Sequence, residues 1–354
     1  MQGRIGHLKQ AVPTRGRCGI PSHDATLMNK MVCVVVVLAA FLALGPVACT
    51  PKPEPITVAW SPFEHGVLLW VGEDQGMFRQ NGLDVTLRKY DTGAGSLNGM
   101  LNGEADVTVG VTEFPMVKSA FTRSRARIIG AAAKVEQLYL VGRRDRGIGE
   151  ISDLKGKRVG TTFGTIAEFY LGRFLQVNGF GMQDIVAVDL KTPAEWENAV
   201  AEGVVDAIVT AQPYADLAAN RLGSNAIVWA TQGGQYIFGL IVSSEEWTTA
   251  HPELVDRFLK SLALAEEYVA RHPAEAKAMM QNKLNVDASF AESAWSRDQF
   301  FLSLDQSLVL AMEDEARWMI DNGLTNQKVV PDFMEYIYVD GLKAVRPEAV
   351  NLIR

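Results

Sequence analysis

One structural unit occurs twice in this chain, and it limits the folds that the chain can adopt. In residues 101–115 a helical segment ends at a glycine turn, a short apolar strand follows, and a proline starts the next helix. The same order is found in residues 200–214. Alternating helices and strands of this kind predict an α/β architecture with a largely parallel sheet. Two similar lobes explain the repetition economically, although a common βα motif used twice would also produce it.

The segments around this unit continue the alternation. We expect strands at 56–60, 83–87, 107–111, 128–133, 185–190 and 207–210. We expect helices at 67–75, 97–101, 115–121, 166–178 and 193–202.

The last third of the chain has a different pattern. His251-Pro252 and His272-Pro273 each open a helical run, and no strand signal of comparable quality lies between them. We therefore expect residues 247–354 to be helices that return to pack on the first lobe. The first lobe is then residues 56–142 plus 240–354, and the second lobe is 143–239. The chain would cross between them near residues 140–144 and 237–242.

The N-terminal segment is typical of an export signal. Met28-Asn29-Lys30 precedes an uncharged run at 31–48, which ends in small residues before Cys49. A transmembrane helix is the alternative, because the run is just long enough to span a bilayer. We interpret residues 1–48 as a leader, with Met28 a better start than Met1, and 49–55 as a Pro-rich tether. The end of the run resembles the bacterial lipobox, with Pro46 in place of the usual leucine-like residue, and this resemblance implies a lipid on Cys49.

Cysteine content and charge exclude several classes of function. The only cysteines are Cys18, Cys33 and Cys49, so the part after Cys49 cannot form a disulfide, a thiolate metal site or a cysteine nucleophile. Histidines and carboxylates show no metal-binding pattern, and we expect neither a metal nor a cofactor. The leader holds five of the 34 basic and one of the 41 acidic side chains, so the remainder carries a net charge of −11. This charge argues against a nucleic-acid partner.

A set of short motifs carries a family resemblance. These are residues 72–78 with 81–85, then 101–106, 153–160, 203–207 and 251–271. In this order, over about residues 56 to 275, they resemble the nitrate/sulfonate/taurine-type substrate-binding proteins of ABC importers, whose relatives also bind pyrimidine precursors of thiamine.

The resemblance implies a type II-like periplasmic-binding-protein fold, with two lobes joined by two hinge strands and a small-molecule ligand between them. The resemblance also implies delivery of the ligand to a membrane permease and ATPase. We expect a monomer that is anchored by its lipid in the periplasm or at the cell surface. A receptor for a membrane sensor is an alternative. A thiamine-pyrimidine-synthase-like enzyme is another, but such enzymes rely on a cysteine-rich motif that is missing here, so we expect no enzyme.

The candidate site residues follow from the α/β fold. In open α/β sheets ligands bind beyond the carboxyl ends of the strands, so the loops after the strands supply the candidates. On the first lobe these are Trp60, Phe63, Glu64, His65, Thr92, Thr112, Glu113 and Phe114. On the second lobe they are Phe163, Gly164, Thr165, Gln212 and Tyr214.

Each candidate also has a purely structural explanation. The loop before the helix at 166–178 offers backbone N–H groups and a positive dipole end to an anion, but Thr165 and Glu168 also form a capping-box pattern that needs no ligand. The aromatic residues suit either a cleft wall or the core, and His65 suits a satisfied loop position. Glu64 and Glu113 would not favour a bare anion, so we expect a zwitterion with an amine, or a neutral polar heterocycle, unless both carboxylates face solvent or cap helices.

Overall fold

A computed structural model describes residues 52–353, so the predicted leader and Cys49 lie outside the described residues. The predicted tether is too long by two residues, because strand β1 (Glu54–Trp60) already begins at Glu54. The N–H of Glu54 donates to the carbonyl of Gly82, which extends the pairing with the next strand. Among residues 52–353 no helix has the length and apolar character needed to cross a membrane.

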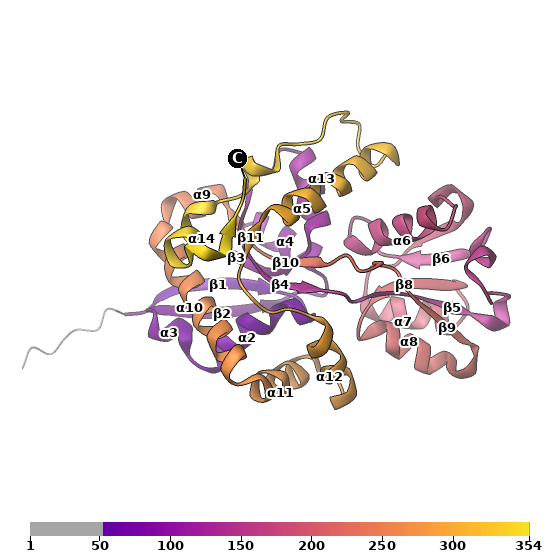
Figure 1. Ribbon diagram of the computed structural model, residues 1–354, viewed down its shortest axis with the longest axis horizontal. Helices are drawn as coiled ribbons and strands as arrows, with labels where there is room; N and C mark the ends of the chain where they lie inside the picture. The colour runs from indigo at the N-terminus through magenta and orange to yellow at the C-terminus, as the bar shows by residue number, and fades with distance from the viewer. Residues whose placement is uncertain (1–51, 354) are drawn as a thin grey trace, which may run out of the picture. The chain divides into compact units, whose positions relative to one another are not determined.

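The first sheet is mixed and has the strand order β2-β1-β3-β10-β4 (Figure 1). Strand β1 pairs in parallel with β2 (Leu83–Lys89) and β3 (Val107–Val111). Strand β10 (Ile237–Ser244) pairs antiparallel with β3 and with β4 (Ala126–Val135). All of β3 is buried, as expected for a central strand covered on both faces. Helices α2 (Val67–Asp74), α3 (Met77–Gln80), α4 (Gly93–Leu101) and α5 (Glu113–Phe121) belong to this half.

The second sheet repeats the arrangement, with the order β7-β6-β8-β5-β9. Its strands are β5 (Leu138–Arg143), β6 (Arg158–Thr161), β7 (Val186–Asp189), β8 (Ala207–Ala211) and β9 (Ala226–Ala230). Its helices are α6 (Ile166–Val177), α7 (Pro193–Ala201) and α8 (Tyr214–Leu222). The predicted two-lobed α/β architecture is therefore confirmed.

The crossings between the sheets lie a few residues from the predicted positions. The chain leaves the first sheet after Val135 and joins the second at Leu138, and it returns between Ala230 and Ile237. Residues 140–144, a predicted crossing, lie mostly in β5, where they pair with β8 and β9. Residues 237–242, the other predicted crossing, lie in β10. Both runs are extended and apolar, and such a pattern predicts a strand without saying which sheet the strand joins.

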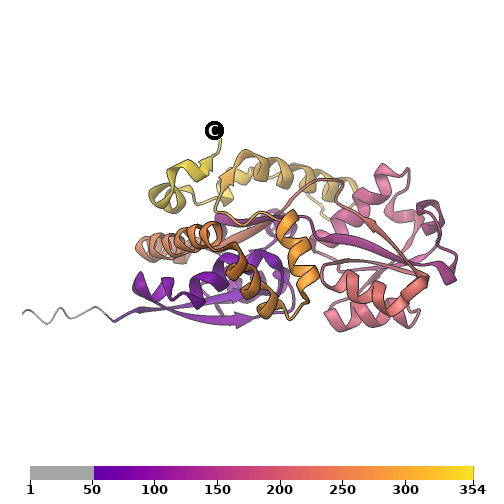
Figure 2. The ribbon, with the colours of Figure 1, turned by 60° about the horizontal axis from the view of Figure 1, so that its bottom comes forward.

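The C-terminal part is mainly helical, as expected. It comprises α9 (Glu245–Ala250), α10 (Pro252–Arg271), α11 (Pro273–Leu284), α12 (Ala288–Arg297), α13 (Gln306–Asp321) and α14 (Val339–Val345). Helix α10 buries one apolar stripe against α2 and α3, where Phe258 stacks on Phe78 with ring centroids 5.3 Å apart. Figure 2 shows the orange α10 beside these indigo helices. Two short strands, β11 (Leu304–Asp305) and β12 (Val350–Asn351), pair in a way that the sequence did not indicate.

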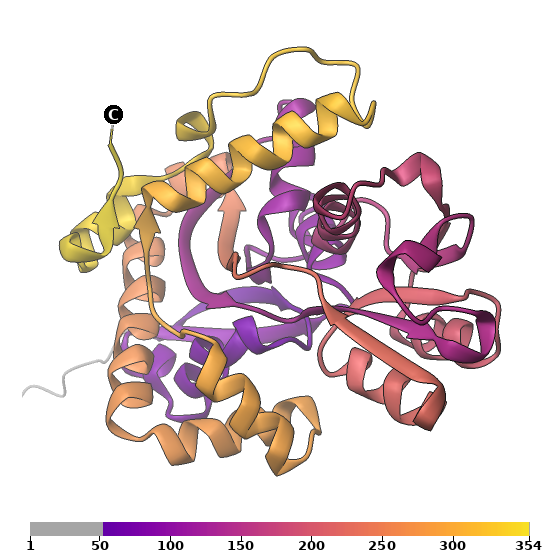
Figure 3. The same cartoon turned by 45° about the vertical axis from the view of Figure 1, so that its right-hand side comes forward.

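Helix α13 contacts both lobes, whereas we expected the C-terminal helices to pack on the first lobe alone. Trp318 lies 6.0 Å from Phe114 of α5 and 5.5 Å from Phe169 of α6, measured between ring centroids. Asp314 forms an ion pair with Arg173 of α6 at 3.5 Å. Figure 3 shows α13 passing over α5 towards α6. The small residue Gly172 permits this contact, since a Cβ there would lie 2.1 Å from the Trp318 ring.

Candidate functional site: a cavity between the two sheets

A narrow cavity of about 60 Å³ lies between the lobes. Both lobes and the first crossing contribute to its wall. From the first lobe come Phe63, His65, Thr92, Gly93, Ala94, Gly110, Thr112 and Pro115. From the crossing and the second lobe come Gln137, Leu138, Thr162, Thr165, Ile166, Ala167, Trp196, Val209, Thr210 and Ala211.

Three helices begin at this cavity. The wall includes the first residues of α4 and α6 with their N-caps Thr92 and Thr165, and it includes Thr112, the N-cap of α5. Thr92 and Thr165 each accept one N–H of their own helix, from Gly95 and Ala167. Each helix N-terminus carries partial positive charge and N–H groups that the helix itself cannot satisfy. Three of them at one cavity make a favourable environment for an anion.

The loop before α6 uses some of its N–H groups internally. Phe163 N–H donates to Asp189 and Gly164 N–H donates to Glu168, at 3.0 and 2.6 Å. Asp189 thus satisfies the N–H of Phe163 and Glu168 that of Gly164, and neither Phe163 nor Gly164 lines the cavity. The N–H groups of Thr165 and Ile166 have no hydrogen-bond partner in the described part of the chain. The N–H groups free for a ligand thus belong to Thr165, which is a predicted site residue, and to Ile166, which is not.

The cavity wall carries no formally charged side chain. His65 is its one titratable group, and burial lowers the pKa of His65 to about 4, so the ring is neutral near pH 7. Its Nε2 lies 2.8 Å from the side-chain nitrogen of Gln137. The other polar groups of the wall are mainly threonine hydroxyls. An anion bound here would meet dipoles and N–H groups, not a cation.

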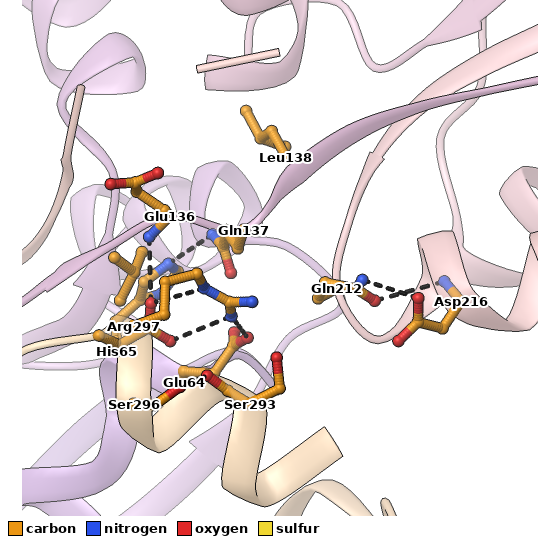
Figure 4. A network of polar contacts seen from close by, with 12 residues as sticks. Glu64, His65, Glu136, Gln137, Leu138, Gln212, Asp216, Ser293, Ser296 and Arg297 are labelled. Carbon is orange, nitrogen blue, oxygen red and sulfur yellow. Dashed lines mark hydrogen bonds and ion pairs between the residues drawn. The ribbon is translucent and has the colours of Figure 1, made fainter. Parts of the chain in front are cut away.

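Glu64 does not line this cavity and belongs to a polar network with Arg297 (Figure 4). Its carboxylate lies 3.6 Å from the guanidinium of Arg297 at the end of α12, and Arg297 also pairs with Asp298 at 3.1 Å. Asp298 accepts the N–H of Glu136 at the first crossing. Burial, and secondly the charge of Asp298, raise the pKa of Glu64 to about 8. The network joins the loop after β1 to the C-terminal helices.

Glu113 does not reach the cavity either. It is fully buried in the first turn of α5, and one carboxylate oxygen accepts the N–H of Phe238 at 3.1 Å. Burial raises the pKa of Glu113 to about 8. Burial also raises the pKa of Glu315 on α13, and the negative charge of Glu113 raises it further. The expectation that Glu64 and Glu113 hold a ligand amine is therefore wrong for this geometry. Glu64 faces Arg297, and one oxygen of Glu113 accepts the N–H of Phe238.

The predicted aromatic residues divide between cavity and core. Phe63 lines the cavity and packs edge-on against Tyr214, which itself packs on Trp196 at 5.2 Å. Phe114 is completely buried among Phe169 and Trp318, so it is a core residue. The remaining predicted residues lie outside the wall, with Trp60 against Trp70, Phe163 exposed, and Gln212 bonded to Asp216 (Figure 4).

The structure thus places five of the predicted residues at the cavity, namely Phe63, His65, Thr92, Thr112 and Thr165. Their contact with a ligand stays a prediction. Sequence reasoning missed Gln137 and Trp196. Gln137 stands in an extended run with no turn signal, and Trp196 occupies a buried position of an ordinary Thr-capped helix. Neither pattern marks a residue as ligand-facing.

The architecture is the periplasmic-binding-protein fold, as solved structures show. The alkanesulfonate-binding protein SsuA from Xanthomonas axonopodis pv. citri, bound to MOPS, has a TM-score of 0.70 and 19% identity, covering 82% of this chain and 100% of that chain. The periplasmic aliphatic sulphonate binding protein SsuA from Escherichia coli has a TM-score of 0.65 and 17% identity, covering 81% and 98%.

The chain belongs to the NMT1/THI5 like family, whose model matches residues 64–276. A relative from Bacillus subtilis (strain 168), described as a putative aliphatic sulfonates-binding protein, is 21% identical over 265 residues, which is 74% of this chain and 79% of the relative. These findings confirm the family resemblance drawn from the motifs.

The fold alone does not determine whether a protein is an enzyme. The desulfurization enzyme DSZB has a TM-score of 0.61 and 16% identity, covering 83% of this chain and 99% of its own. Function must therefore be argued from the site. The residues of the cavity wall include no cysteine, carboxylate, lysine or arginine. Every side-chain hydroxyl of the wall belongs to a threonine.

Proposed function

We propose that this protein is the solute-binding component of a bacterial ABC importer and that it captures a small organic sulfonate without chemical change. The convergence of three helix N-termini on an uncharged cavity is the observation that carries the proposal. A sulfonate has three acceptor oxygens and one delocalised charge that does not titrate near pH 7. Helix N-termini satisfy such a group through N–H donors and dipoles.

The two lobes supply complementary parts of this environment. Helices α4 and α5 belong to the first lobe and α6 to the second, so a ligand between them gains its full set of donors only when the lobes are closed. We expect ligand binding to favour the closed form, with bending at the two crossings. Small-angle scattering with and without ethanesulfonate tests this expectation, and an unchanged radius of gyration at saturation would contradict it.

The N–H of Ile166 offers a direct test of the anion site. Ile166 is the first residue of α6, where proline is tolerated because the helix has no use for that N–H. The preceding residue, Thr165, has the extended conformation that a following proline requires. Ile166→Pro should therefore keep the helix while it removes one ligand donor.

Isothermal titration with ethanesulfonate gives the readout. A lost hydrogen bond to a charged group corresponds to about 1.5–3 kcal/mol, so Ile166→Pro should weaken binding by roughly 10- to 100-fold. Ile166→Val keeps the N–H and controls for the altered side chain. Ethylamine, which has the opposite charge, should not bind. Equal affinity in the proline and valine variants, or preference for the amine, would refute the anion site.

We further propose that the mature protein is a monomer, attached by lipid at Cys49 to the outer face of a membrane, in the periplasm or at the cell surface. The apolar run before Cys49 and the Pro-rich segment after it support this proposal. Cys49→Ala should yield released protein or uncleaved precursor. Identical partitioning of wild type and variant into detergent, with no acyl mass on the wild-type chain, would contradict it.

A further inference from the structure

Gln137 belongs to the cavity wall and has a buried side-chain acceptor without a hydrogen-bond partner in the described structure. Its side chain is 2% exposed. Its backbone N–H donates to Gln232 at 2.6 Å, and its side-chain nitrogen lies 2.8 Å from Nε2 of His65. Within residues 52–353 its Oε1 has no hydrogen-bond partner.

The contact with His65 shows which atom of the Gln137 amide has no partner. His65 is neutral, so one ring nitrogen carries a proton and the other is an acceptor. The side-chain nitrogen of Gln137 faces Nε2 of His65 at 2.8 Å, and an amide nitrogen can only donate, so Nε2 is the acceptor and the ring proton is on Nδ1. With the proton on Nδ1, Nε2 accepts a hydrogen bond from the Gln137 amide nitrogen. The amide oxygen is then the atom left free (Figure 4).

A buried acceptor without a partner is costly, by about 1–3 kcal/mol. A ligand that brings an N–H or O–H to this oxygen removes that cost, whereas an alkyl group of the same size leaves it. Sites built to bond a substrate hydroxyl reject the analogue that lacks it for this reason. Gln137 therefore favours a ligand with a donor group in addition to its anionic group.

The charges around the cavity indicate which donor is preferred. An ammonium group would need a nearby carboxylate to offset its desolvation, and no carboxylate lines the wall. Glu64, next to His65, already faces Arg297. A hydroxyl donates equally well and carries no charge.

We infer that Gln137 is a specificity-determining residue and that the ligand is a hydroxyalkanesulfonate, with its hydroxyl donating to Gln137 Oε1. This inference rests on the proposed function, since the helix N-termini would hold the sulfonate. It predicts a preference both over the plain alkanesulfonate and over the amino analogue.

Isothermal titration with 2-hydroxyethanesulfonate, ethanesulfonate and 2-aminoethanesulfonate tests the inference. The wild type should bind the hydroxy compound at least tenfold more tightly than either of the others. Gln137→Met, which has similar length but no amide, should reduce the hydroxy-to-alkyl affinity ratio to about one. Gln183→Met, at an exposed position of the second lobe, should leave the ratio unchanged.

The wild-type ratio is decisive even if the Gln137 variant does not fold. Equal or tighter binding of ethanesulfonate by the wild type would overturn the inference while sparing the proposed function, as would tighter binding of the amino compound. A preference that survives in Gln137→Met would overturn the role of this residue. Failure of all three sulfonates to bind would overturn both the inference and the proposed function.

Discussion

Replacing Glu113 by glutamine should stabilise this protein at alkaline pH. Glu113 on α5 and Glu315 on α13 are both fully buried, and each has a carboxylate oxygen without a partner in the described structure. No ion pair joins either carboxylate to a cation within residues 52–353. Glutamine has the shape of the protonated acid, and its oxygen can still accept the N–H of Phe238.

The sign and size follow from the pKa. Burial raises the pKa of Glu113 from 4.5 to about 8, so the folded protein holds this proton when the unfolded chain has lost it. The contribution to stability is complete below about pH 4.5 and is lost as the pH rises through about 8. Each tenfold change in proton affinity corresponds to about 1.4 kcal/mol, so the loss reaches as much as about 5 kcal/mol above pH 8. Glu113→Gln removes this loss.

Urea unfolding at pH 5, 6.5 and 8 measures the effect. Wild type and Glu113→Gln should differ by less than about 1 kcal/mol at pH 5, and the variant should be the more stable by several kcal/mol at pH 8. Glu202→Gln, at an exposed position, should follow the wild type. Parallel pH profiles for wild type and Glu113→Gln would refute the reasoning, because they would mean that Glu113 ionises in the folded state as easily as in the unfolded chain.

Two further substitutions test other parts of the structure by urea unfolding. Arg297→Met leaves the buried Glu64 and Asp298 without their cation. Burial raises the pKa of Asp298 to about 6 and that of Glu64 to about 8, so both are mainly protonated at pH 5. The loss of folding stability should therefore be small at pH 5 and about 3–5 kcal/mol at pH 8. An equal loss at both pH values would contradict this account. Gly172→Ala places a methyl group 2.1 Å from the Trp318 ring and should cost about 1–3 kcal/mol. No change in stability would show that α6 and α13 are not packed together as described.

Sequence patterns predicted most of the secondary structure, because apolar periodicity, glycine turns and helix-starting prolines act within a few residues of chain. The predicted strand at 107–111 matches β3 to the residue, since an apolar run bounded by turn residues leaves little choice. Helices α10 and α11 begin at Pro252 and Pro273, because the fixed φ of proline suits the first position of a helix.

The errors concern contacts between distant segments. We expected Pro115 to start a helix, but α5 begins two residues earlier at Glu113, and its first turn places Phe114 against α6 and α13. Only the return of α13 after about 200 residues makes that face of α5 interior. The position of Gln137 in the cavity wall likewise cannot be predicted from the residues around it in sequence. Its partners His65 and Gln232 come from a distant loop and from the second crossing.

The side chain of Gln232 has a mechanical consequence. Its oxygen accepts the N–H groups of Gln137 and Leu138 at 2.6 and 2.8 Å, and its nitrogen donates to the carbonyl of Val135 at 3.1 Å. Gln232 thereby fastens the return crossing to the outgoing one, so the two segments cannot slide past each other without breaking three hydrogen bonds. Two independent linkers would allow the lobes to twist as well as to bend. We expect linkers tied in this way to favour bending over twisting, and a ligand bound to Gln137 to contact the segment that Gln232 holds.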